Sequence, residues 1–468
     1  MNRPKKKKLQ MPDTYLILFI LIVCSAIATY IIPSGEFERI EEEGITKVIP
    51  GTYSGVESSP ANLMDFFLSF QNGMVEAASL IFLVLFTGGA FAVIEASGAI
   101  NAGIKAAIDK TRNKKVILII VVTALFSLGG SVGIVANSVI AFVPIGIMLA
   151  RAMKLDALIG VSIIYLGAYA GFNAGFMNPF TLGIAQQIAE LPLYSGITFR
   201  IILYIVIVAV TIIYISWYTK KIIKDPSQSI MGEHRFQNSE NESSDNNLES
   251  TKFTLTHKII LIFFAFCLVF YIYGTRQFDW EVDEMSAMFV AIAIGAGIIA
   301  RMGGNEIIRH FMKGAQNLVY GALIVGVARA IVVVLEDGLI LDTIVQGMAV
   351  ALESSTPIVG AIGMFIGNAF FNILVPSGSG QAAVAMPILT PLADMLNIPR
   401  QVAVQAFQLG DGFSNSIIPT SGVLMASLAV GGVPYTKWFR FMWPLMTIWI
   451  AIGCIAAALG VIINWGPF

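Results

Sequence analysis

Long apolar stretches make up most of this chain, and short polar segments separate them. A helix of about 20 apolar residues crosses the roughly 30 Å hydrocarbon core of a bilayer. Runs of about that length recur from one end of the sequence to the other, most clearly at residues 16–32, 81–94, 116–128, 201–217, 259–273, 288–300, 318–335 and 444–463. The pattern predicts an all-α polytopic membrane protein with about 11 to 13 crossings.

Charged residues are few, and their sum is close to zero. They make up 13% of the chain, whereas about 25% is usual in soluble domains. The formal net charge of −1, without a basic face, argues against a nucleic-acid partner. No nucleotide-binding loop, zinc signature or nucleophile elbow occurs, so we expect neither an enzyme nor a bound cofactor.

The distribution of basic residues sets the expected orientation. Arg3 and Lys5 to Lys8 precede the first apolar run, whose length and lack of a small-residue cleavage site favour a retained helix. The loop that follows is acidic, and Lys220, Lys221 and Lys224 follow a later run. The positive-inside rule therefore places the N-terminus in the cytoplasm and the chain in the inner (cytoplasmic) cell membrane.

One polar segment, residues 225–250, is rich in Ser, Asn and Glu, and it predicts a flexible cytoplasmic linker between two halves. We divide the chain accordingly into five parts. Residues 1–61 hold the basic N-terminus, the first helix and an external loop; 62–218 a first repeat; 219–257 the linker; 258–304 connecting helices; and 305–468 a second repeat.

The two halves carry the same landmarks at a nearly constant spacing. Phe199-Arg200 matches Phe439-Arg440, Pro179 matches Pro419, Pro144 matches Pro387, and Gly73…Glu95 matches Gly314…Glu336, all at offsets of about 240 residues. By the charge count, the helix before Glu95 runs from outside to inside, whereas the helix before Glu336 runs from inside to outside. Inverted repeats with interrupted helices at matching positions indicate a secondary transporter whose binding site lies near the bilayer midplane.

The second half contains the most distinctive polar stretch, residues 367–422. Its Ser377, Gly378, Ser379, Gly380 and Gln381 offer backbone N–H groups, hydroxyls and an amide in a turn-prone run. This is the chemistry of an anion or carboxylate site at a helix tip, although Gly and Ser also allow close helix packing. We take these five residues as candidate substrate ligands.

Asp411 lies between two glycines, deep in apolar sequence. An intramembrane carboxylate is costly unless it has a partner, so it marks a functional site by default. It could bind a substrate ammonium or guanidinium, or with Asn415 a coupling Na⁺ or H⁺; a structural cap on a broken helix is the alternative. Thr420 and Ser421, beside Pro419, are further candidate ligands.

In the first half, Asn173, Asn178 and Thr181 form the symmetry-related polar patch and are expected to complete the site. Arg329 lies in the middle of a run that is otherwise free of charge. It could clamp a substrate carboxylate or pair with a buried acid such as Asp411, and the sequence leaves both readings open.

Four motifs carry a resemblance to a known family: PSGEF at 33–37, NPFTLGIAQ at 178–186, PSGSGQA at 376–382, and GDGFSN at 410–415 with PTSG at 419–422. They resemble the YfcC family, which belongs with the C4-dicarboxylate anaerobic carriers (DcuC type) of the ion transporter superfamily. The resemblance implies two inverted repeats with re-entrant hairpins and broken helices, a scaffold and a transport domain, and elevator-like exchange. Members are assigned as arginine/ornithine-type antiporters, and the broader group includes dicarboxylate carriers.

The leading hypothesis is a secondary transporter for an amino acid, either an antiporter or an ion-coupled carrier. A basic amino acid is one option for its substrate. The alternatives are a carrier of C4-dicarboxylates or other small carboxylates, which would use Arg329 as a clamp, and a passive channel. The expected partners are a small-molecule substrate and the lipid bilayer. The sequence leaves open the coupling ion, Na⁺ or H⁺, and the oligomeric state, with a homodimer as one option.

Overall fold

The computed structural model describes residues 14–42, 45–49, 51–100, 102–103, 115–133, 135, 138–232, 236, 253–278, 280 and 282–466, and these residues are almost entirely helical. The apolar runs predicted from the sequence fall on eight helices. These are α1 (Thr14–Ile31), α3 (Ala78–Ala96), α5 (Lys115–Ser131), α9 (Ile197–Lys224), α10 (Leu255–Gln277), α11 (Val282–Ile299), α12 (Gly304–Asp337) and α18 (Tyr435–Ile462). The prediction of these helices is confirmed.

Seven helices of the described chain have the length and apolar composition needed to span a bilayer: α1, α3, α9, α11, α12, α14 (Pro357–Leu374) and α18. Shorter apolar segments occur in α5, α6 (Val139–Ala152), α7 (Ala157–Asn173), α10, α13 (Leu341–Leu352) and α17 (Gly422–Gly431). Two of them are followed by polar or proline-containing interruptions, α7 by residues 174–179 and α13 by residues 353–357.

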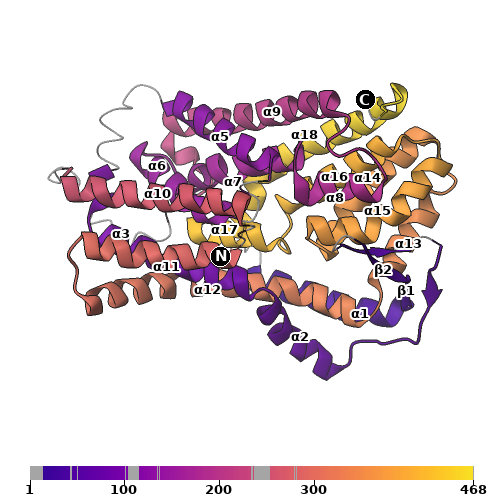
Figure 1. The fold of residues 1–468 in the computed structure, drawn as a ribbon, viewed down its shortest axis with the longest axis horizontal. Coiled ribbons are helices and arrows are strands. Elements are labelled where there is room, and N and C mark those ends of the chain that lie inside the picture. Colours follow the sequence, from indigo (N-terminus) through magenta and orange to yellow (C-terminus); the bar gives the residue numbers. More distant parts are fainter. Residues whose placement is uncertain are drawn as a thin grey trace, which may run out of the picture.

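The helices pack in two similar groups. Helices α5, α7 and α9 contact one another, and so do α14, α16 (Arg400–Asn415) and α18. The two groups meet where α7 contacts α16 and where α9 lies beside α18, along the upper edge of Figure 1. Helix α12, the longest at 34 residues, packs against α1, α2 (Leu63–Glu76), α3 and α17 and forms a separate layer.

The expected external loop contains four short strands, which the sequence analysis does not predict. Strand β1 (Gly35–Glu36) pairs with β4 (Ser54–Gly55), and β2 (Arg39–Glu42) pairs with β3 (Ile45–Val48), both antiparallel. The loop is fastened to α13 because Arg39 Nη2 lies 2.9 Å from Asp342 Oδ2, which also accepts the Phe37 N–H. Val48 and Phe37 share a buried apolar cluster with residues of α13, α14 and α15 (Gly378–Met395) and with Val375 in the turn between α14 and α15.

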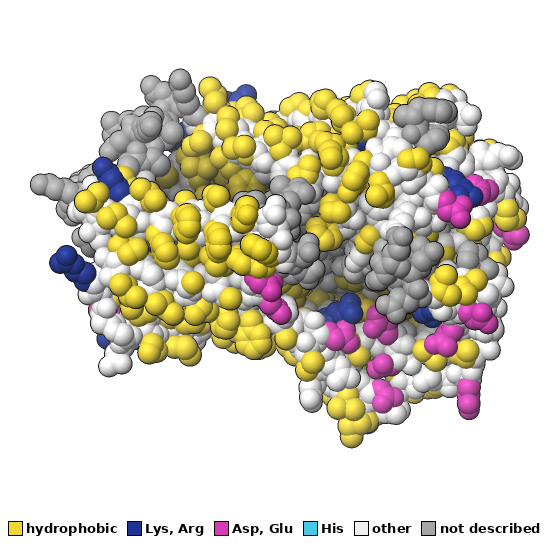
Figure 2. Space-filling view, viewed as in Figure 1, with side chains coloured by type: hydrophobic (Ala, Val, Ile, Leu, Met, Phe, Trp, Pro, Cys, Tyr) yellow, Lys and Arg dark blue, Asp and Glu magenta, His cyan; other side chains and the backbone are white. Residues whose placement is uncertain are grey.

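The surface separates by residue type. Figure 2 shows hydrophobic side chains covering the face over α10 and α11, whereas acidic side chains gather toward α2 and the strands β1 and β2. Apolar side chains also project outward from α9, where Ile202, Ile205 and Ile213 are more than half exposed. Large exposed apolar faces of this kind fit contact with lipid tails rather than with water.

Residues 233–235 and 237–252 of the predicted linker lie outside the described residues. The part next to α9 forms a short 3₁₀ turn, η2 (Pro226–Gln228), and Ser229 donates to the buried Asp156 carboxylate at 2.6 Å. Asp156 also caps α7 by accepting the Ile159 N–H. The first residues after α9 are therefore tied to the start of α7.

Candidate functional site

Three interruptions of the helices converge on the second half of α16. The first lies between α7 and a π-helical turn, η1 (Pro179–Gly183), which leads into α8 (Ile184–Ile188). The second is the turn at Pro376 between α14 and α15. The third lies between α16 and α17 and contains Pro419. Contacts of α16 with α7, η1, α8, α14 and α15 bring them together.

Asp411 is completely buried on α16. Its two flanking glycines do not break the helix, because α16 continues to Asn415. The glycines instead allow neighbouring helices to approach. A Cβ on Gly410 would lie 2.7 Å from the Phe365 carbonyl oxygen of α14, and a Cβ on Gly412 would lie 2.8 Å from Asn173 Cα of α7. The structure therefore does not favour a capping role for Asp411, which lies one turn before the helix end.

The Asp411 carboxylate is only half satisfied. Its Oδ1 accepts from Asn415 Nδ2 at 3.1 Å, while Oδ2 has no hydrogen-bond partner among the described residues. That free oxygen faces the start of α15 and the first-half interruption, since a Cβ on Gly378 would lie 3.3 Å from it and 2.6 Å from Thr181 Cγ2. Residues from both halves of the chain thus meet at one carboxylate oxygen.

Other buried polar atoms around this point also lack partners within the described part of the chain. They are Asn173 Nδ2 and Oδ1, Asn178 Nδ2, Thr181 Oγ1, Asn372 Oδ1, Gln381 Oε1, Ser416 Oγ and Thr420 Oγ1. Because most buried polar groups in folded proteins are hydrogen-bonded, such a concentration calls for an explanation. A polar ligand or water that occupies the space between these groups would supply the missing partners.

The helix ends give the surroundings of Asp411 two opposite polarities. Helix α15 presents its N-terminus, where the Ser377 side chain accepts the Gly380 N–H at 3.3 Å, and Ser421 precedes the N-terminus of α17. Free N–H groups at helix N-termini favour negative groups, whereas the C-terminus of α16 and the carboxylate favour positive ones. A ligand with both charges would find complementary groups here.

The predicted residues of the second-half turn differ in exposure. Ser379 is exposed, Ser377, Gly378 and Gly380 are half-buried, and Gln381 is buried. Gln381 Nε2 donates to Asn368 Oδ1 at 2.9 Å, and this bond connects α15 to α14. Only the amide oxygen of Gln381 lacks a partner among the described residues. The exposed serine leaves this tip accessible from outside the protein core.

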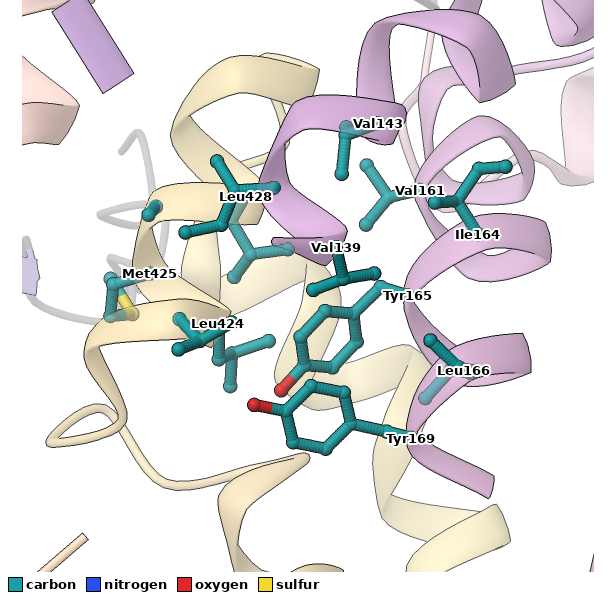
Figure 3. Close-up of a cluster of buried hydrophobic side chains, with 14 of the residues drawn as sticks. Val139, Val143, Val161, Ile164, Tyr165, Leu166, Tyr169, Leu424, Met425 and Leu428 are labelled. Atoms are coloured by element: carbon teal, nitrogen blue, oxygen red, sulfur yellow. The ribbon is translucent and has the colours of Figure 1, made fainter. Parts of the chain in front are cut away.

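Two tyrosines that the sequence analysis does not single out lie beside the site. Tyr165 and Tyr169 of α7 stack with ring centroids 4.3 Å apart, and Figure 3 shows their hydroxyl groups next to each other, facing α17. Tyr165 donates to the Asn415 carbonyl at 3.1 Å. Tyr169 lies within electrostatic range of the Asp411 carboxylate. The sequence offered no signal for these two tyrosines, because residues four positions apart in an apolar helix are typical of a packed core.

Arg329 lies outside this group. Its Nε is 2.6 Å from Glu76 Oε2, and its Nη2 is 4.0 Å from Glu336 Oε1. The hypothesis that Arg329 pairs with Asp411 is therefore wrong. Its ion pairs join α12 to α2 and leave its guanidinium about one-third exposed.

Comparison with known proteins identifies the family to which this chain is similar. The family model described as "C4-dicarboxylate anaerobic carrier" (DcuC) matches residues 11–462. An "Uncharacterized protein" of Haemophilus influenzae is 30% identical over 96% of this chain and 97% of its own length. The "Putative basic amino acid antiporter YfcC" of Escherichia coli K12 is 32% identical, with 92% of both chains covered.

Two solved structures align with most of the chain at low similarity. The Neisseria gonorrhoeae protein MtrF, from a class described as antimetabolite efflux pumps, has 17% identity, a TM-score of 0.41 and coverage of 96% of this chain and 95% of its own. The Alcanivorax borkumensis YdaH transporter has 13% identity, a TM-score of 0.41 and coverage of 97% and 99%. A likeness of this extent carries no conclusion about the site.

Proposed function

The chain belongs to the C4-dicarboxylate anaerobic carrier (DcuC) family and is a multi-pass membrane transporter rather than an enzyme, and we propose that it is a secondary active transporter for an amino acid. Its substrate is a small molecule, and its apolar helices lie in the bilayer. The name of the E. coli relative supports a basic amino acid and an exchange mechanism.

The single observation that carries the substrate proposal is the position of Asp411 Oδ2, which is buried, has no hydrogen-bond partner among the described residues and is turned toward the N-terminal end of α15. In the proposed binding mode the substrate carboxylate accepts from the N–H groups of Gly378 and Ser379 and from the hydroxyls of Ser377 and Ser379. The substrate ammonium or side-chain cation contacts Asp411. A zwitterion therefore satisfies both polarities at once.

The remaining proposed ligands come from both halves. Asn173, Asn178 and Thr181 of the first half, with Asn415, Thr420 and Ser421 of the second, surround the same carboxylate in our proposal. The oxygen-rich set around Asp411 and Asn415 suits a coupling Na⁺, and the unpaired carboxylate oxygen equally suits a proton.

The proposed transport mechanism rests on two inverted repeats. Helices α9 and α18 each have 28 residues, and α5, α7 and α9 pack together as α14, α16 and α18 do. These parallels support the five-part division of the chain and an elevator-like movement of the broken helices against the layer built on α12. We further propose a cytoplasmic N-terminus and an inner-membrane location, as the positive-inside rule indicates; residues 1–13 lie outside the described residues.

Uptake into liposomes that contain the purified protein tests the site. We expect labelled arginine or ornithine to enter against internal unlabelled substrate, and Asp411→Asn and Ser379→Ala each to reduce this exchange. Normal exchange by both variants would refute the site. Saturable exchange without single-channel currents would exclude a passive channel, and the size of the purified particle in detergent would decide whether the protein is a homodimer.

A C4-dicarboxylate is the second candidate substrate, because the family description names one. It fits less well here because the proposed clamp, Arg329, is paired with Glu76. Counterflow with labelled succinate, run beside labelled arginine, separates the two. Succinate counterflow without arginine counterflow would replace the amino-acid proposal.

A further inference from the structure

Arg200 is a buried cation at the start of α9, and 1% of its surface is exposed. Its Nη1 donates to Gln405 Oε1 at 2.7 Å and to Gln408 Oε1 at 3.1 Å, and its Nη2 donates to Gln401 Oε1 at 2.8 Å. The guanidinium also stacks on the Trp465 ring, with 4.9 Å between its Cζ and the ring centroid. All these partners are neutral.

A buried charge with neutral partners is costly, and it persists only where its hydrogen bonds are well satisfied. Apolar residues of similar volume often replace a buried charged network without loss of stability, so packing alone gives no reason for this one. The three glutamines occupy one face of α16 at positions i, i+4 and i+7, the same helix that carries Asp411. The arginine therefore acts on the helix that holds the central carboxylate of the proposed site.

Gln408 differs from Gln401 and Gln405 because it also contacts the interruption that follows α7. Its Oε1 accepts from Arg200, and its Nε2 donates to the Gly175 carbonyl at 2.8 Å. Gly175 lies between Asn173 and Asn178 in the interruption that follows α7. With its oxygen held by the guanidinium, the amide of Gln408 is fixed in the orientation that donates to that carbonyl.

We propose that Arg200 and Gln408 are positioning residues, which hold the first-half interruption at residues 174–183 in register with Asp411 on α16. Arg200 orients the Gln408 amide, and Gln408 fixes the Gly175 carbonyl. This in turn sets the places of Asn173, Asn178 and Thr181 opposite the carboxylate. The consequence for transport rests on the proposed function, whereas the positioning itself does not.

The matching position in the second half behaves differently. Arg440, which the repeat pairs with Arg200, is exposed on α18. Both halves therefore carry an arginine at this position, but only Arg200 is buried and hydrogen-bonded to a neighbouring helix. Arg440 serves as a matched control for substitutions of Arg200.

The decisive comparison is Gln408→Met with Gln405→Met. Both remove one acceptor from Arg200 and neither adds charge, but only the first removes the donor to Gly175. Hydrogen–deuterium exchange of the purified full-length protein then reports on the amides of Gly175 and Gly183, which donate within the interruption. We expect Gln408→Met to speed their exchange about three- to tenfold, the effect of losing one hydrogen bond, and Gln405→Met to leave it unchanged.

Equal exchange in the two variants, or no change in Gln408→Met, would overturn the proposal. The same variants in arginine uptake should show a raised KM for Gln408→Met only, whereas a purely structural loss would lower the amount of active protein at constant KM. Arg200→Lys should raise KM and Arg440→Lys should not; the reverse order would also overturn the proposal. If the wild-type protein takes up neither arginine nor succinate, the proposed function fails while the exchange measurement still decides the positioning.

Discussion

Gly412 tests whether the close approach of α7 and α16 builds the site. A Cβ at this position would lie 2.6 Å from Asn173 Oδ1 and 2.8 Å from Asn173 Cα, closer than real Cβ contacts come. The amide oxygen can rotate away, but the Cα belongs to the backbone of α7. Gly412→Ala must therefore push the two helices apart.

The magnitude follows from two opposing terms. Overpacking of this kind costs about 1–3 kcal/mol, and the better helix propensity of alanine returns about 1 kcal/mol. Gly347, in the middle of α13, is the matched control because nothing lies within 4 Å of a Cβ there. Gly347→Ala should gain about 1 kcal/mol, so the two variants should differ by about 1–3 kcal/mol.

Thermal unfolding of the purified protein in detergent measures the difference. At about 1 °C per kcal/mol for a chain of this length, we expect Gly412→Ala to melt about 1–3 °C below Gly347→Ala. Gly412→Ala should also reduce exchange transport, since it moves Asn173 relative to Asp411. Equal melting temperatures would show that α7 and α16 do not pack as closely as described.

Three further outcomes are expected. Arg329→Gln should leave the KM for arginine within about twofold of wild type and change stability by no more than about 1 kcal/mol, because its pair with Glu76 is partly exposed; a large rise in KM would restore Arg329 as a substrate clamp. Asp156→Ala should destabilise the protein by about 1–3 kcal/mol in thermal unfolding, since it leaves buried donors without an acceptor. In a background without Cys24, Cys267 and Cys454, Ser379→Cys should react with a membrane-impermeant maleimide and be protected by substrate, whereas Ala385→Cys, which is buried, should not react.

Much of the helical architecture could be predicted from composition alone. A continuous run of apolar residues has few alternatives in a bilayer, because a helix satisfies its own backbone hydrogen bonds. The helices α1, α9, α12 and α18 follow directly from this rule. The short strands at 35–55 were not predicted, and their attachment to α13 joins residues more than 300 positions apart, Phe37 and Arg39 with Asp342.

The candidate site was partly predictable because its polar residues are out of place in apolar sequence. Asp411, Asn173 and Thr181 stood out on that ground, and the structure brings them together. Tyr169 and Gln408 did not stand out, since a tyrosine or a glutamine in a helix is ordinary. Their importance depends on what lies opposite them, Asp411 in one case and the Gly175 carbonyl in the other.

The sequence by itself determined which segments lie in the membrane and which carry the unusual polar groups, since both depend on local composition. Only the tertiary structure decided which of these groups meet. It paired Arg329 with Glu76 rather than with Asp411, and it placed Arg200 among three glutamines. Partners so distant along the chain are chosen by helix packing, where glycines such as Gly412 set how closely two helices approach, and no local pattern encodes that choice.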